Sequence, residues 1–197
     1  MKKILCFAMF MSFGVISLKA QTDAETVTDD MIEKVKTGGF KIGADVGFPL
    51  SGTTDISNFN FGFYGTYLFE VIENLEVGGL VAYTHFSGDG YHYRYQGDTT
   101  IRIDNDSNSF LPIAATARYH FMDHAFFAGL DLGFAVNVSG DADTGMYFRP
   151  KFGYNLGMIN LLASFQVITA EVNHSSQDYF YNVNGFNSFN IGIEYSF

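Results

Sequence analysis

Residue types that could form a hydrolase triad occur together in one short segment of the chain. His174, Ser175, Ser176 and Asp178 supply an imidazole, two hydroxyls and a carboxylate. In a triad the imidazole takes the proton of the serine hydroxyl, and the carboxylate orients the imidazole. Groups from one loop rarely reach that geometry, because triads normally join distant segments of a fold. The segment is therefore not predicted to be a hydrolase site.

A run of oxygen-bearing side chains at 104–108, Asp-Asn-Asp-Ser-Asn, has the spacing that begins a calcium-binding loop. Such a loop also needs a glycine at its sixth position and a glutamate at its twelfth. Ser109 and Ala115 stand at those two positions. No calcium loop is predicted, and the sequence indicates no cofactor.

The elements that would position reactive groups are β-strands, and the last nine residues indicate this most clearly. In 189–197, apolar or aromatic side chains occupy every odd position, and small or polar ones occupy every even position. A period of two gives a strand with one apolar face and one polar face. The chain ends on the aromatic residue of this strand, Phe197.

Eight segments from residue 38 onward share this alternation, and they predict an all-β fold. All but the seven-residue segment 161–167 are about 9–12 residues long, close to the roughly 9–11 that a tilted strand needs to cross a bilayer. On every segment the face that carries the aromatic side chains lacks charge. The predicted strands are 40–48, 59–69, 75–83, 111–121, 126–136, 146–156, 161–167 and 189–197.

The connections between these segments alternate in length. An even number of antiparallel strands puts both chain termini on one side of the membrane, the periplasmic side, so the short turns are expected on that side and the longer loops outside. The short connections are 70–74, 122–124 and 157–159, the intermediate ones 49–57 and 139–144, and the long ones 87–108 and 170–185.

The N-terminus has the features of a secretory signal peptide over residues 1–20. Lys2 and Lys3 precede a short apolar run, and Ala20 provides a small residue at the cleavage site. The run is shorter than the ~20 apolar residues of a membrane-spanning helix. Cys6, the single cysteine, lies in the signal, so the mature chain forms no disulfide. Residues 21–37 are acidic and are expected to form a periplasmic lead-in to the barrel, which covers 38–197.

The composition excludes nucleic acid as a partner and favours a membrane barrel. Loss of the signal leaves 8 of the 11 Lys and Arg residues against 21 Asp and Glu, a net charge of −13. Phosphate binding needs a positive surface. Hydrophobic residues make up 47% of the chain, with 22 Phe, 12 Tyr and 21 Gly, yet no later apolar run is long enough for a membrane helix.

On strand number, alternation and the terminal aromatic residue, 38–197 resembles the small eight-stranded outer-membrane barrels of the OmpA/OmpX type. The resemblance implies an up-and-down transmembrane β-barrel in the outer membrane of a Gram-negative bacterium, surrounded by outer-membrane lipid. It also implies that Tyr195 and Phe197 form the signal that the barrel-insertion machinery reads. The alternative is a soluble calycin-type barrel, whose aromatic side chains would point inward around a ligand.

The polar faces carry eight charged residues that this fold would place in the lumen. An eight-stranded barrel is just wide enough for side chains to fill it. Charges there lose hydration and must be paired to be tolerated. Because the two signs are balanced, we expect an ion-pair network and no continuous pore. The residues are Lys41, Asp45, Glu76, Arg118, Asp131, Arg149, Lys151 and Glu194.

The connection 87–108 is the most distinctive external segment. Tyr91, Tyr93 and Tyr95 alternate with polar residues that include Arg94, and Gly97-Asp98 then precedes a second alternating run. This pattern predicts a β-hairpin. Its tyrosines and Arg94 could bind an extracellular protein or another surface ligand by edge pairing and aromatic contact. Alternatively, the tyrosines pack against the hairpin's own strands.

The sequence therefore predicts an outer-membrane barrel with a plugged lumen and a structural or adhesive role, and no enzymatic activity. Two alternatives remain open. Some eight-stranded barrels are lipid-modifying enzymes, and His85, beside Thr84 and Ser87, is the nearest candidate here, although it lacks an obvious carboxylate partner. The other alternative is a narrow ion channel, which would need an excess of one charge sign in the lumen.

Overall fold

A computed structural model describes the backbone of residues 36–50, 53–54, 57–88, 90–95, 99–104, 106–176 and 179–197. Within these ranges, the side chains of 36–37, 90–95, 99–104, 172–176 and 179–184 are not described. The expected signal peptide and nearly all of the expected lead-in lie outside the described residues.

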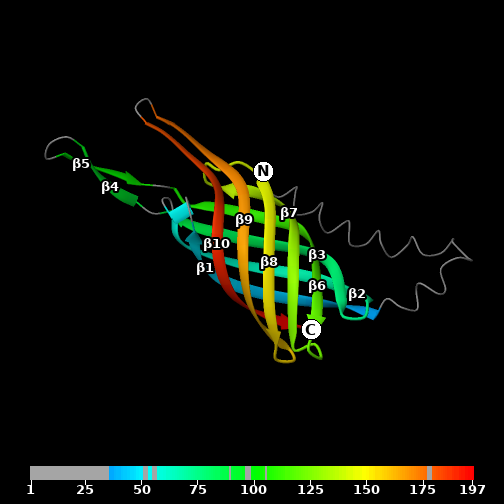
Figure 1. Ribbon diagram of the computed structural model, residues 1–197. Coiled ribbons are helices and arrows are strands. Elements are labelled where there is room, and N and C mark those ends of the chain that lie inside the picture. The colour runs from blue at the N-terminus through cyan, green and yellow to red at the C-terminus, as the bar shows by residue number, and fades with distance from the viewer. Residues whose placement is uncertain are drawn as a thin grey trace, which may run out of the picture. The chain divides into compact units, whose positions relative to one another are not determined.

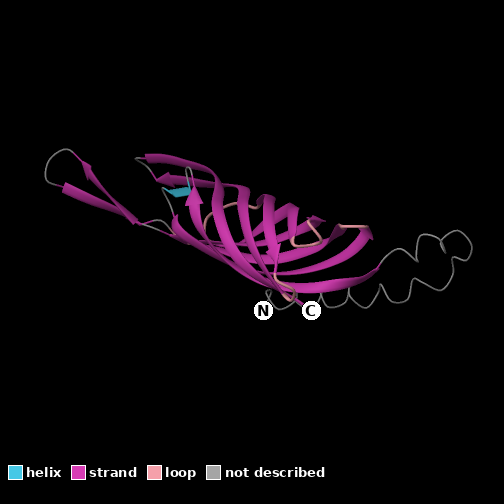
Figure 2. Ribbon diagram, turned by 60° about the horizontal axis from the view of Figure 1, so that its bottom comes forward, coloured by secondary structure: helices cyan, strands magenta, loops and turns pink. Residues whose placement is uncertain are grey.

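Eight long antiparallel strands close into a barrel, in the order β1-β10-β9-β8-β7-β6-β3-β2 (Figures 1 and 2). The first and last strands close it, with Phe48 of β1 opposite Phe189 of β10. The predicted eight-stranded antiparallel barrel is confirmed. The strands are β1 (Lys36–Leu50), β2 (Ser57–Ile72), β3 (Leu75–Gly88), β6 (Asn108–Phe121), β7 (Phe126–Ser139), β8 (Gly145–Asn155), β9 (Ile159–Ser176) and β10 (Tyr179–Ser196).

Two regions predicted as loops contain further strand pairing. Within 87–108, β4 (Gly90–Tyr95) and β5 (Thr99–Asp104) form a separate two-stranded sheet, as the alternation there indicated. The segment 170–185 was expected to be a long loop, and this was wrong, because β9 and β10 continue through it as a paired hairpin. Backbone pairing needs no apolar face, so the polar sequence of this segment does not end the strands.

Three tight connections lie at the same end of the barrel as the start of β1 and the end of β10. They follow β2, β6 and β8, and two of them contain left-handed non-glycine residues, Asn74 with φ of 69° and Met122 to His124 with φ of 53–63°. We call this the short-turn end and the opposite end the long-loop end. The last residue is held at the short-turn end, where the Phe197 amide donates a hydrogen bond to the Phe40 carbonyl at 3.0 Å.

The outer face of the barrel is apolar. Every strand of the barrel carries large hydrophobic side chains on its outward face, and exposed fractions reach 58% for Phe63 and 63% for Phe134. So large an apolar surface marks a membrane interface, and in a barrel it contacts lipid. A soluble calycin-type barrel, with its aromatic face inward, does not have this surface. Among the described residues, no helix is long and apolar enough to cross a membrane.

Aromatic rings gather on the outer face near the short-turn end. Phe126 packs against Phe121, Phe152 and Tyr154 with centroid distances of 4.9–6.0 Å. Aromatic residues of transmembrane barrels concentrate at the membrane–water interfaces in this way. These rings therefore mark one boundary of the lipid-facing band.

Candidate functional site

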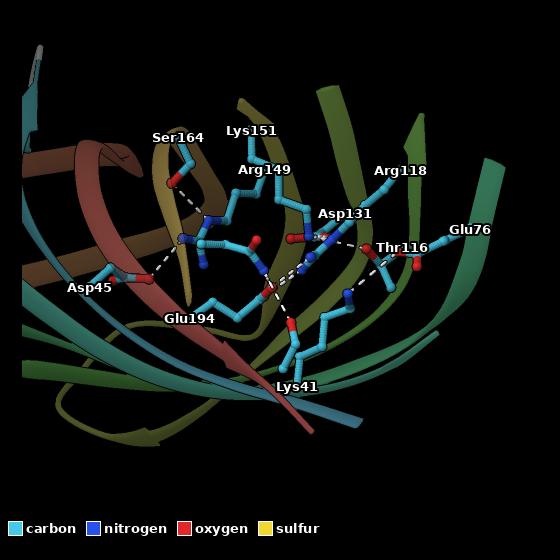
Figure 3. Close-up of polar contacts among 12 residues, drawn as sticks. Lys41, Asp45, Glu76, Thr116, Arg118, Asp131, Arg149, Lys151, Ser164 and Glu194 are labelled. Carbon is cyan, nitrogen blue, oxygen red and sulfur yellow. Dashed lines mark hydrogen bonds and ion pairs between the residues drawn. The ribbon is translucent and has the colours of Figure 1, made fainter. Parts of the chain in front are cut away.

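The barrel interior is the strongest candidate site, because it holds all eight of the predicted lumen charges (Figure 3). Arg118 of β6 and Glu194 of β10 come from opposite sides of the barrel and form a two-pronged ion pair, with N–O distances of 2.7 and 2.5 Å. Asn160 donates a further hydrogen bond to Glu194 at 3.0 Å. The Arg118 guanidinium also lies 4.8 Å from the Phe127 ring centroid. Both charged side chains are fully buried.

A second pair lies nearer the middle of the barrel. Arg149 of β8 donates to Asp45 of β1 at 2.8 Å and to the Ser164 hydroxyl at 2.9 Å. Its guanidinium lies 5.2 Å from the Tyr64 ring centroid. Planar guanidinium groups suit such combined ion-pair and aromatic contacts. This pair joins strands that are three positions apart in the barrel, so it crosses the lumen.

The third and fourth pairs are more local. Lys151 of β8 contacts Asp131 of the neighbouring strand β7 at 2.5 Å and the Thr116 hydroxyl at 3.1 Å. Lys41 lies 3.7 Å from Glu76 near the short-turn end, where these side chains are 12% and 23% exposed. His120 lies 3.2 Å from the same Glu76 carboxylate. Each of the eight predicted charges thus lies within ion-pair distance of an opposite charge.

Inward-facing glycines make room for this interior, and two of them face aromatic rings. A side chain at Gly43 would meet the Tyr64 ring, and one at Gly153 would meet the Phe127 ring. Among the described glycines, Gly129 lies beside the aliphatic parts of Arg118 and Lys151. The glycines thus leave space both for the rings near the guanidinium groups and for the charged stems.

Neutral amides occupy the lumen beyond the ion pairs, toward the long-loop end. Asn60 of β2 donates to Asn190 of β10 at 2.6 Å, and Asn190 donates to the Ser188 hydroxyl at 3.0 Å. All three side chains are buried. These residues were not predicted from the sequence, because uncharged polar residues on an inward face give no distinctive signal.

An aromatic layer fills the long-loop end of the lumen. The rings of Phe86, Phe110 and Phe186 lie 4.9–6.2 Å apart and are almost completely buried. Ile168, which directly follows the predicted strand 161–167, packs in the same cluster of buried residues. A signal for this layer is present in the sequence, because each of these residues is apolar and in the inward register of its strand. The layer was not predicted, because a lone apolar residue in the inward register is less distinctive than a charge.

The outer wall carries a separate polar group near the long-loop end. His85 Nδ1 lies 2.8 Å from the Ser109 hydroxyl, which also accepts a hydrogen bond from Tyr83 at 3.1 Å. The His85 ring packs against Phe61, with centroids 5.2 Å apart. The histidine's partner is therefore Ser109, whereas sequence proximity suggested Thr84, whose side chain is buried.

Other residues predicted from the sequence fall partly outside the described side chains. Tyr91, Tyr93, Arg94 and Tyr95 occupy β4, where only the backbone is described. The same holds for His174 to Ser176, and Asp178 lies outside the described residues. At the C-terminus the rings of Tyr195 and Phe197 lie 4.9 Å apart on the outer wall. Among the described residues, no three His, Cys, Asp or Glu side chains gather as a metal site.

No protein-family model matches the chain, and no curated protein sequence matches it. Several solved structures are similar to it, among them the following three. The E. coli outer membrane protein W is 14% identical, with a TM-score of 0.38, over 82% of this chain and 99% of the other. Outer membrane protein AlkL, solved in lipid bilayers, is 13% identical, with a TM-score of 0.42, over 91% and 96% of the two chains. The β-domain of the Bordetella autotransporter BrkA is 14% identical, with a TM-score of 0.22, over 82% and 100%.

The geometry of the chain itself defines what kind of protein it is. Eight antiparallel strands close on themselves, the outward side chains form an apolar band, and the inward side chains include every charge predicted for the lumen. This combination is that of a transmembrane barrel surrounded by lipid. The chain folds into an eight-stranded antiparallel β-barrel with the apolar outer wall and polar interior of a transmembrane barrel, as its sequence predicted.

Proposed function

We propose that the lumen of this barrel is plugged by its own side chains, and that the protein acts at the cell surface in a structural or adhesive role. The ion pairing of the lumen carries the first part of this proposal. Four cations and four anions lie within ion-pair distance of one another, and the two central guanidinium groups are buried. An ion-selective pore needs an excess of one sign, which this interior lacks.

The layers beyond the ion pairs support the same proposal. An ion entering from the long-loop end would meet the rings of Phe86, Phe110 and Phe186, and then the amides of Asn60 and Asn190. Displacing buried rings or splitting buried charge pairs costs several kcal/mol per group, on the order of 3–5. A passage that needs both kinds of change would conduct very slowly.

The orientation follows from the asymmetry of the connections. In barrels of this type the short turns are periplasmic and the longer loops extracellular. The short-turn end then faces the periplasm, and the β4–β5 and β9–β10 hairpins face outward. A two-stranded sheet has unpaired edges to which a further strand could add. Tyr91, Tyr93, Arg94 and Tyr95 would supply side-chain contacts to an extracellular protein or surface ligand.

The C-terminal strand has a second partner in this proposal. Tyr195 and Phe197 lie on the outer wall beside Phe40, where they are accessible before lipid surrounds the barrel. The barrel-insertion machinery would recognise them during assembly. This role ends when β10 pairs with β1 and closes the barrel.

The role we propose is not enzymatic. Ser109 is 3% exposed and lies beneath Tyr83 and His85, so its hydroxyl is poorly placed to attack a lipid ester. In the described part of the chain, no carboxylate hydrogen-bonds to His85 as a triad would require. Replacing His85 or His174 with alanine should leave the lipid A of the cell unchanged by mass spectrometry. A change in lipid species would favour a lipid-modifying enzyme.

Single-channel recording tests the plugged lumen. The purified protein, shown to be folded because it migrates faster on a gel when unboiled, is added to a planar bilayer. We expect no steady conductance steps. Steady steps would favour the alternative, a narrow ion channel, and would overturn the proposal for the lumen. A protein whose mobility does not change on boiling would instead contradict the barrel's insertion as a compact unit.

The adhesive role is tested on whole cells. Cells that express the protein with Tyr91, Tyr93 and Tyr95 changed to serine should settle from suspension more slowly than wild-type cells. A matched control changes Ile101 and Ile103, which pair with Tyr93 and Tyr91 across the hairpin, to serine. If cells with the tyrosine variant and wild-type cells settle at the same rate, with equal amounts of the protein at the surface, the adhesive role is contradicted and the structural role is favoured.

A further inference from the structure

A groove of about 710 Å³ crosses the outer wall of the barrel over β10, β1, β2 and β3. It runs from Ile159 and Tyr195, near the short-turn end, to Tyr83 and Leu111, closer to the long-loop end. Its volume falls within the roughly 300–1,000 Å³ typical of small-molecule sites. The outward side chains that line it are hydrophobic or aromatic, so it is continuous with the lipid-facing band.

Two small residues create the groove. Ala44 of β1 lies between Ile193 and Phe63 in its cross-strand row. In the next row Gly65 of β2 lies between Ile42 and Val81. The larger neighbouring side chains form the walls of the groove. Its floor consists of backbone and the methyl group of Ala44. The groove is therefore a property of two adjacent rows of the sheet.

One residue that lines the groove, Tyr83, also belongs to the polar group on the outer wall. Tyr83 lines the groove and donates its hydroxyl proton to Ser109, which is hydrogen-bonded in turn to His85. Ser109 can accept from Tyr83 and donate its own proton to His85 Nδ1. In the tautomer that accepts at Nδ1, the imidazole carries its proton on Nε2. In that tautomer His85 has a donor two residues beyond Tyr83 on β3.

We propose that the groove and His85 together bind one ester-linked acyl chain of a membrane lipid. The chain lies over Ala44 and Gly65, and the ester carbonyl accepts a hydrogen bond from His85 Nε2. This inference uses the proposed orientation of the barrel for one point only, namely which leaflet of the membrane supplies the lipid. A neutral ester oxygen fits better than a phosphate, because neither the groove lining nor the group of Tyr83, Ser109 and His85 contains Lys or Arg.

Filling the groove tests the site for the acyl chain. Gly65→Leu places a side chain on the groove floor, where a Cβ would lie 3.5 Å from the Phe40 ring, an ordinary contact. Gly79→Leu is the matched control. It is also an outward glycine with no atom within 4 Å of a Cβ, but it does not line the groove. Both variants therefore add the same side chain to the lipid-facing wall without strain.

The measurement is lipid retention by the full-length protein. Each variant is reconstituted with dipalmitoyl phosphatidylcholine or its dihexadecyl ether analogue, extracted in detergent, and examined by native mass spectrometry. We expect the wild type and Gly79→Leu to retain one lipid, and Gly65→Leu to retain at least tenfold less. The wild type should retain the ester about fivefold better than the ether, the effect of one neutral hydrogen bond. His85→Phe, which keeps the ring against Phe61, should lose this preference.

Three outcomes would overturn the inference: equal retention by Gly65→Leu and wild type, no retained lipid, or equal retention of ester and ether by the wild type. The unboiled gel is run on the same samples. A protein that does not migrate as a folded barrel would instead contradict its insertion in the membrane. Failure of the lipid site in a folded barrel is therefore distinguishable from failure of the proposed function.

Discussion

Separating the Arg118–Glu194 pair should destabilise the barrel strongly, whereas removing both charges should not. The pair spans the lumen, is fully buried, and has N–O distances of 2.7 and 2.5 Å. Glu194→Leu leaves a buried guanidinium without its carboxylate, and Arg118→Met leaves a buried carboxylate without its guanidinium. The double variant replaces both with apolar side chains of comparable length, so neither charge is stranded.

The size of the effect depends on whether water fills the lumen. For charges about 4 Å apart, the attraction is about 4 kcal/mol at an effective dielectric constant of ~20 and about 1 kcal/mol in water. Removing one partner of a buried pair costs roughly 3–5 kcal/mol, and replacing both is neutral or stabilising by about 1–4 kcal/mol. We expect the buried values here. Lys41→Met, which breaks the partly exposed 3.7 Å contact with Glu76, is the control and should cost about 1 kcal/mol or less.

The free energies come from urea titrations of the lipid-reconstituted protein, with the folded fraction measured on unboiled gels and extrapolated linearly to zero urea. A double-mutant cycle then gives the coupling between the two residues. If each single variant costs less than about 1 kcal/mol, the pair is hydrated and the argument for a plugged lumen is refuted. Single costs that simply add in the double variant would refute the pairing itself.

Three further substitutions test other parts of the barrel. Phe110→Ala should cost about 3–5 kcal/mol in the same titration, because it empties the centre of the aromatic layer; a cost below 1 kcal/mol would mean that the layer is loosely packed. Gly153→Leu should cost at least 1–3 kcal/mol through overlap with a buried ring, whereas Gly79→Leu should be neutral; equal costs would contradict the close packing. Phe197→Ala should lower the amount of protein in the outer membrane while changing its free energy of unfolding little. Phe189→Ala, on the same outer face of β10, should not lower that amount. Equal losses of membrane-inserted protein in both variants would contradict the role of Phe197 as an insertion signal.

The strands were predictable because one physical rule governs them. A barrel wall separates lipid from lumen at every residue, so alternation persists along each strand and shows in a single sequence. The rule fails where the wall is no longer bounded by lipid. In 170–185 the polar residues gave no alternation, yet backbone hydrogen bonding continued the strands.

The charged residues of the lumen could be predicted from the sequence, but their ion-pair partners could not. Inward register identified each charged residue. The partner of Arg118, however, comes from the opposite side of the barrel, and that contact depends on strand tilt and stagger, which alternation does not encode. The Ser109–His85 contact illustrates the same limit. It joins residues 24 apart in sequence through cross-strand pairing.

The charges inside the barrel also bear on how accurately the sheet must assemble. A strand that slips by one position turns every inward side chain outward. For β8, such a slip would turn Arg149 and Lys151 into the hydrocarbon, at a cost of about 2–4 kcal/mol each near the bilayer midplane. The charged residues of the lumen thus favour the correct strand register during insertion. The same residues that stabilise the correct barrel raise the free energy of a misaligned one, because there they face lipid.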